Sequence, residues 1–159
     1  MFPEHLQQLE TFVGPRLHLL LQDQTATRRG LEDADPKTRW AALILATHHW
    51  GVMEQLGKKC EDMALHDPDP LVRSEAVGCL GFCFSGTSDL RIQMLLATKL
   101  ANESESYSIR RAAYMSLLKV SGRPAYSPQD LNLRIPEDID WEFVHGALAQ
   151  RPPAWRPDP

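Results

Sequence analysis

Residues 67–81, DPDPLVRSEAVGCLG, contain the start of a helix and one of its apolar faces. Asp69 directly precedes Pro70, which suits a helix start because an aspartate caps free N–H groups and a proline at the first position has no N–H to satisfy. Ala76 and Leu80 follow Arg73 by three and seven residues, offsets that share one helical face. The stretch therefore predicts an amphipathic helix from residue 70 onward.

The same pattern occurs three times along the chain. Residues 31–39, LEDADPKTR, align without a gap on residues 65–73, LHDPDPLVR, with Leu, Asp, Asp, Pro and Arg in common. A weaker third copy, residues 101–110, needs one inserted residue and has the polar stretch NESES where the helix would start. An alanine, an apolar residue and a glycine that suits a helix end follow each arginine at similar distances. The three sets are Arg39, Ala42, Ala46 and Gly51; Arg73, Ala76, Leu80 and Gly86; and Arg110, Ala113, Leu117 and Gly122.

Second helices are expected between these segments, from Val52 to about Leu65 and from Asp89 to about Ala101. Both stretches have apolar residues at helical spacing. A single short helix pair cannot bury its apolar faces alone, so consecutive pairs must stack on one another. The repeat therefore predicts an all-α fold.

The stretch 67–81 resembles the first-helix signature of HEAT repeats, including the shorter bacterial type, and the resemblance covers about residues 31–122. Tetratricopeptide repeats have a compatible length, but their Trp, Leu-Gly and Tyr pattern is not found. The resemblance implies a HEAT-like α-solenoid of stacked antiparallel helix pairs in one domain, residues 1–150. Its parts would be capping helices in 1–30, repeats at 31–66, 67–101 and 102–149, and a Pro-rich tail at 151–159.

The resemblance also assigns roles to particular side chains. In HEAT-like repeats the arginine at the position of Arg39, Arg73 and Arg110 bonds loop carbonyls and acidic groups between neighbouring units, and Asp33, Asp67 and Glu103 are placed for this. The last repeat is irregular. Its terminal helix is expected to act as a cap that packs on the rest of the third repeat through Trp141, Val144 and Leu148.

Composition excludes some classes of function. The net charge of -4 disfavours nucleic acid as a partner, because binding to phosphates requires a basic surface. No apolar run approaches the roughly 18 residues of a membrane-spanning helix, and the first residues have no signal-peptide pattern. We therefore expect a cytoplasmic protein, in which the three cysteines are thiols.

The side chains that carry chemistry are scattered. Cys79 and Cys83 are four residues apart and could present two thiolates, and His48 and His49 lie near a helix end, but no second Cys or His pair has matching spacing. The sequence contains no glycine-rich phosphate loop, nucleophile elbow or HExxH motif. We predict that the chain is not an enzyme and holds neither a metal nor a cofactor.

A protein-binding surface remains the best functional prediction. The second helices line the concave face of HEAT-like stacks, which points to Gln55, Lys59, Asp62, Arg91, Gln93 and Met94 as exposed partner-binding residues. Trp155 in the tail is a second candidate anchor. The predicted function is an adaptor or scaffold, with a bacterial immunity-type inhibitor of a toxin as a sharper version and the oligomeric state left open. The alternative is a HEAT-like enzyme or accessory factor that acts on nucleic acid, as glycosylases do, or on a chromophore, as bilin lyases do.

Overall fold

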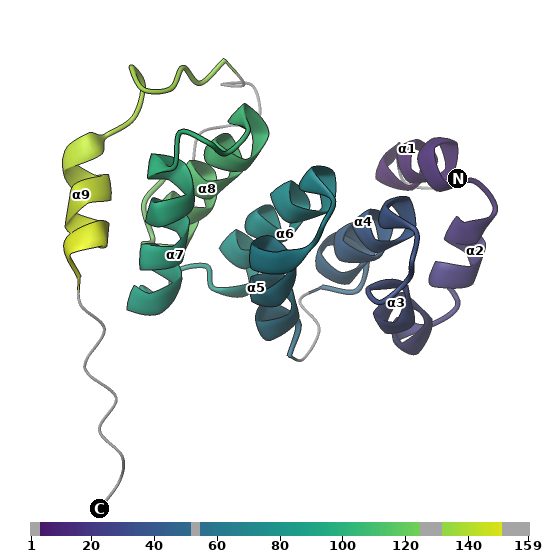
Figure 1. Ribbon diagram of the computed structural model, residues 1–159. Coiled ribbons are helices and arrows are strands. Elements are labelled where there is room, and N and C mark those ends of the chain that lie inside the picture. The colour runs from purple at the N-terminus through teal and green to yellow at the C-terminus, as the bar shows by residue number, and fades with distance from the viewer. Residues whose placement is uncertain (1–3, 52–54, 125–131, 151–159) are drawn as a thin grey trace, which may run out of the picture. The chain divides into compact units, whose positions relative to one another are not determined.

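The described part of the chain is all-α. The computed structural model describes residues 4–51, 55–124 and 132–150, and these contain helices and no strand. The chain divides into two compact units, Met1–Cys79 and Leu80–Pro159. Figure 1 shows the helices along the chain. The described helices are α1 Glu4–Val13, α2 Arg16–Leu20, α3 Gln24–Gly30, α4 Pro36–Ile44, the π-helix η1 Leu45–His49, α5 Leu56–His66, α6 Pro70–Cys83, α7 Leu90–Ala101, α8 Tyr107–Val120 and α9 Trp141–Ala149.

The three repeat helices begin where the sequence predicts. The side chain of Asp35 accepts a hydrogen bond from Lys37 N at the start of α4, and Pro36 is the first helical residue. Asp69 accepts from Leu71 N at 2.9 Å at the start of α6. Ser106 caps α8 in the third copy, so that this copy uses a hydroxyl where the others use an aspartate. Each cap satisfies an N–H group that the helix itself leaves without an acceptor.

The repeat helices also end where the sequence predicts. Gly51, Gly86 and Gly122 have φ values of +73°, +70° and +68°, which a residue with a Cβ adopts only at a steric cost. The nine residues of α4 and the five of η1 together match the 14 residues of α6 and of α8. The predicted inward positions are confirmed: Ala42, Ala46, Ala76, Leu80, Ala113 and Leu117 are all 0% exposed.

The first repeat helix contains a wide turn that the sequence did not predict. Trp50 N donates to Leu45 O at 3.0 Å, a bond to the fifth residue back that defines the π-helix η1. The indole N–H of Trp50 donates to Thr27 Oγ1 at 2.8 Å, and the Thr27 hydroxyl in turn donates to Leu20 O at 2.7 Å. This relay ties η1 to α3 and to the end of α2.

The N-terminal segment of the first unit forms three short helices. The sequence predicts capping helices in residues 1–30, and the structure has α1, α2 and α3 there, with Gly14 at φ +60° between the first two. Leu9, Leu17 and Leu20 are buried, and α1, α2 and α3 all contact α4. These helices cover the apolar surface of the first repeat helix.

The second helices agree with the sequence in part. Helix α7 starts one residue after the predicted Asp89, whose side chain caps it through Ile92 N. The described part of α5 starts at Leu56, and residues 52–54 at the predicted start lie outside the described residues. Helix α9 packs against α7, and Val144 is fully buried. The sequence predicts that this helix packs on the third repeat; its main neighbour is instead α7, in the second repeat, and the Asp140 N–H before α9 donates to the Tyr114 hydroxyl oxygen of α8 at 3.2 Å.

Candidate functional site

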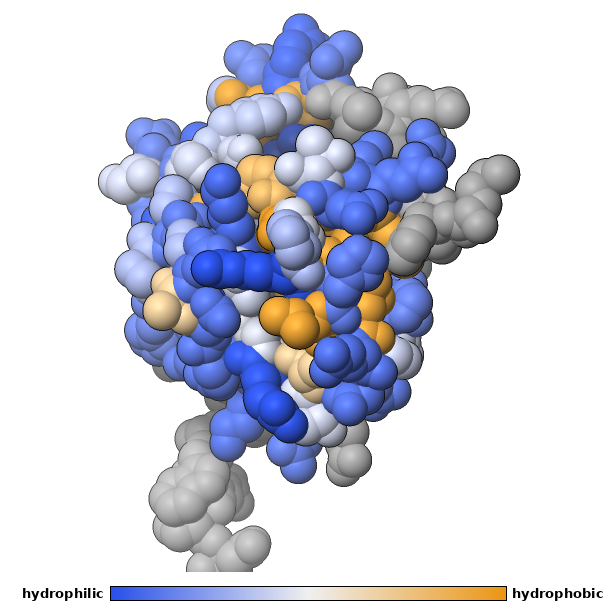
Figure 2. All heavy atoms as spheres, turned by 90° about the vertical axis from the view of Figure 1, so that its right-hand side faces the viewer, coloured by the Kyte–Doolittle hydropathy of each residue, from blue (hydrophilic) through white to orange (hydrophobic). Residues whose placement is uncertain are grey.

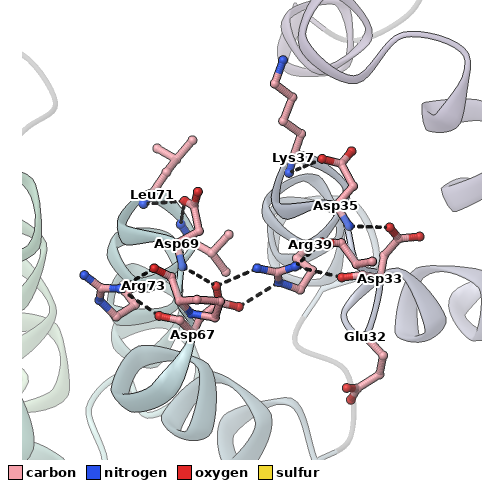
Figure 3. A network of polar contacts seen from close by, with 12 residues as sticks. Glu32, Asp33, Asp35, Lys37, Arg39, Asp67, Asp69, Leu71 and Arg73 are labelled. Carbon is pink, nitrogen blue, oxygen red and sulfur yellow. Dashed lines mark hydrogen bonds and ion pairs between the residues drawn. The ribbon is translucent and has the colours of Figure 1, made fainter.

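The first unit contains a network of polar contacts around the repeat arginines (Figure 3). Arg39 binds both carboxylate oxygens of Asp67 at 2.8 Å and also donates to the carbonyls of Asp33 and Ala34. Arg73 donates to the carbonyls of Asp67 and Pro68. Each arginine therefore stabilises the turn that precedes its own helix, and Arg39 also holds the turn of the next repeat.

The turns themselves use one conformation three times. The side-chain oxygen of Asp33 accepts from Asp35 N at 2.8 Å, and that of Asp67 accepts from Asp69 N at 3.0 Å. In the third copy Asn102 accepts from Ser104 N at 3.0 Å. An Asx turn needs a short side-chain acceptor, charged or neutral, so asparagine can form it in the third copy.

The electrostatics of Asp67 follow from its surroundings. Its side chain is 5% exposed and that of Arg39 is 11% exposed. Burial alone would raise the pKa of Asp67, but the hydrogen bonds from Arg39 and from Asp69 N–H lower it below its ordinary value. The same ion pair raises the pKa of Arg39. Arg39 and Asp67 therefore satisfy each other's charge. In the third repeat the corresponding arginine, Arg110, donates to Leu100 O at 2.8 Å.

The predicted partner-binding residues of α5 lie in the first unit. Gln55 is exposed and has a left-handed φ of +63°. Lys59 pairs with Glu32 at 2.6 Å, and exposed Asp62 contacts His66 at 3.1 Å. These three positions are thus at least partly accessible, and whether they contact a partner stays a prediction.

The predicted residues on α7, in the second unit, include one error. Arg91 is exposed and Met94 is half-buried, but Gln93 is only 5% exposed, so the prediction that it faces solvent is wrong. The buried stripe of α7 is broad because both α8 and α9 pack against this helix. Trp155 lies outside the described residues.

The first unit exposes large apolar side chains that sequence reasoning did not single out. Leu19 is 61% exposed, Leu71 46% and Phe12 39%. Figure 2 shows the face formed by α1 to α3, on which apolar residues gather between strongly hydrophilic ones. A signal for Leu19 existed, because the helical spacing of Leu17 and Leu20 leaves the residue between them on the opposite face.

An aromatic pair lies beside a half-buried acid in the same unit. The rings of Phe12 and Trp40 meet edge to face with centroids 4.8 Å apart, and the ammonium of Lys37 is 5.1 Å from the Phe12 centroid. Burial raises the pKa of Glu75, while a hydrogen bond from Trp40 acts in the opposite direction. This carboxyl therefore reaches its ionised form less readily than an exposed glutamate does.

The groups considered for metal binding do not come together in the described ranges. Residues 4–51, 55–124 and 132–150 contain no group of three or more His, Cys, Asp or Glu side chains arranged to hold an ion. Cys79 is buried, with its sulfur 3.9 Å from both Leu43 O and Thr47 Oγ1, and Cys83 is half-buried. No described helix is long and apolar enough to cross a bilayer.

Comparisons of the chain with protein-family models, curated proteins and solved structures gave no match.

Proposed function

We propose that this chain is a non-catalytic protein-binding module, an adaptor or scaffold, whose helix pairs stack as a short HEAT-like α-solenoid. Two features support the stacked arrangement. Arg39 and Arg73 each donate to carbonyls six and five residues before them. The same Asx turn precedes all three repeat helices. These recurring contacts support a repeated helical unit, and the ion pair between Arg39 and Asp67 joins one copy to the next, as stacking requires.

Exposure of Leu19 is the observation that carries the binding role. At 61% exposed, Leu19 keeps most of its apolar surface in water. It lies on α2, and Figure 2 shows apolar residues at the surface on the side of α1 to α3. Covering such a side chain with a partner contributes about 1.5–3 kcal/mol when burial is complete. The helices behind it are held by the Trp50–Thr27 relay and by close packing on α4. A partner would therefore meet a preformed surface and pay little entropy to order it.

Affinity capture with the full chain tests this proposal. Immobilised wild-type chain is exposed to lysate of the source cells, retained proteins are identified, and each candidate is purified and titrated against the chain. We expect a direct complex that Leu19→Asp weakens by about tenfold or more, as for a buried apolar anchor. Leu65→Asp is the matched control, since Leu65 lies on α5 and is 43% exposed.

The outcomes separate the candidate functions. An inhibited toxin among the partners would identify the immunity-type form of the module. Salt-sensitive binding to duplex DNA at low micromolar concentration, with no protein retained, would overturn the proposal in favour of an enzyme or accessory factor acting on nucleic acid. A protein complex that loses equal affinity with Leu19→Asp and Leu65→Asp would remove the assignment to this face.

A further inference from the structure

A pocket opens on the first unit between α2, α3 and the start of α4. Its volume is about 430 Å³, within the roughly 300–1,000 Å³ of ligand-binding pockets. Its lining includes Leu19, Leu20, Gly30, Arg16, Arg29 and Thr38. The most exposed large apolar side chain of the described residues, Leu19, is thus part of this pocket.

The apolar wall of the pocket is held in place by close packing. A Cβ added at Gly30 would lie 2.4 Å from Leu20 Cδ2 and 3.1 Å from the Cβ of Ala42. A larger residue at this position would make the end of the Leu20 side chain shift, so glycine suits the close approach of α3 to α2 and α4. The Thr27 hydroxyl of α3 donates to Leu20 O, a bond that also holds α3 against the end of α2. The hollow is therefore a built feature of the packing between three helices.

Two arginines give the pocket its polar side. Arg16 is oriented by its bonds to Asp35 at 2.6 Å and to Thr38 at 3.2 Å. Arg29 is exposed, and within the described residues its side chain has neither a hydrogen bond nor an ion pair. The Asp33 carboxylate also lines the pocket, but it accepts the Asp35 N–H of the Asx turn. The lining therefore offers Arg29 as a cation that lacks a partner, in a chain whose net charge is -4.

We infer that this pocket binds a segment of a partner protein in which a large apolar side chain stands next to an aspartate or glutamate. The apolar side chain would enter the hollow against Leu19 and Leu20, and the carboxylate would pair with Arg29. Arginine suits this role because its planar fork donates two parallel hydrogen bonds to a carboxylate. A macromolecular partner fits better than a small molecule, since the exposed surface of Leu19 at the rim needs a wide contact to cover it.

This inference rests on the proposed protein-binding function and specifies the partner's chemistry. The probe is a phage-displayed library of random dodecapeptides, selected on the full wild-type chain. The selected consensus peptide is then titrated by fluorescence anisotropy against wild type, Arg29→Glu, Leu19→Asp and Lys58→Glu. Lys58→Glu is the matched control, because it makes the same change of charge at an exposed position on α5.

The expected consensus joins a Leu, Ile, Phe or Trp to an acidic residue. Arg29→Glu should weaken its binding by about fivefold or more, and Lys58→Glu should leave it unchanged. A peptide with lysine in place of the acidic residue should bind Arg29→Glu better than it binds wild type, which a misfolded variant would not reproduce. Basic consensus peptides, or equal affinities of Arg29→Glu and Lys58→Glu, would overturn the inference. A captured protein whose affinity is unaffected by Arg29→Glu would overturn the pocket assignment and leave the protein-binding function standing.

Discussion

Replacing Asp67 by asparagine should destabilise the fold by removing one charge. Asparagine keeps the acceptor that the Asx turn requires, as Asn102 demonstrates in the third copy. The amide cannot neutralise Arg39, whose guanidinium is 11% exposed and would lose both of its 2.8 Å bonds to a carboxylate. Removing one partner of a mostly buried ion pair costs about 3–5 kcal/mol. Because asparagine retains the turn, we expect about 3 kcal/mol.

Urea denaturation followed by circular dichroism measures this loss. The matched control is Asp62→Asn, since Asp62 is 63% exposed and contacts only His66, also an exposed side chain, in its ion pair. An exposed pair contributes well under about 1 kcal/mol. The double variant Asp67→Asn with Arg39→Met should be more stable than the sum of the two single losses predicts, because no cation is then left without its partner. Equal stabilities of Asp67→Asn and Asp62→Asn would refute the reasoning.

The same ion pair predicts a dependence on pH. The pKa of Asp67 in the folded chain lies below its value in the unfolded chain, about 3.9. The stabilisation is therefore complete above the unfolded pKa and is lost as the pH falls through the folded one. Below pH 4 the wild-type chain should lose stability faster than Asp67→Asn, and parallel acid titration curves would contradict this.

Three further predictions concern single side chains. Gly81→Ala should destabilise the fold by about 1–3 kcal/mol, because the added Cβ would lie 2.9 Å from the Ser116 backbone. Its control on the same helix is Gly78→Ala, whose Cβ would meet nothing within 4 Å and which should stabilise the fold by up to about 1 kcal/mol. Leu80→Ala should cost about 2–5 kcal/mol, since Leu80 is fully buried, and a loss of a few tenths would contradict the assigned register. Glu75→Gln should raise the stability of the fold at pH 7 and reduce the loss of stability with rising pH. The reason is that burial raises the pKa of Glu75, so the folded state favours the protonated carboxyl, which glutamine resembles. A Gln variant less stable than wild type at pH 7 would contradict this. Urea melts measure all three, repeated across pH for the last.

Local chemistry made the repeat helices predictable from sequence. A cap before a helix and a glycine after it act within a few residues, so Asp69 and Gly86 could be interpreted without knowledge of the fold. Ala42, Ala76 and Ala113 were predictable as buried because helical spacing alone places them on one face. The HEAT-like stacking of these helices remains a prediction.

The features that sequence reasoning missed depend on contacts between distant segments. The π-helix η1 has no local signal, and its last turn positions Trp50 against Thr27, 23 residues earlier. Gln93 is buried on α7, a helix that packs against both α8 and α9, which follow it in the chain. The pocket beside Leu19 needs three helices and the close approach at Gly30, which no window of a few residues contains.

The relay from Trp50 through Thr27 to Leu20 has a consequence for how the first unit opens. One hydroxyl accepts the indole proton and donates to a carbonyl, so the Trp50–Thr27 bond breaks when η1 separates from α3, whereas the Thr27–Leu20 bond breaks when α3 separates from the end of α2. The indole proton of Trp50 should therefore exchange with solvent deuterium when η1 separates from α3. Its exchange rate, read from a single resolved NMR resonance, would report the free energy of opening at this contact.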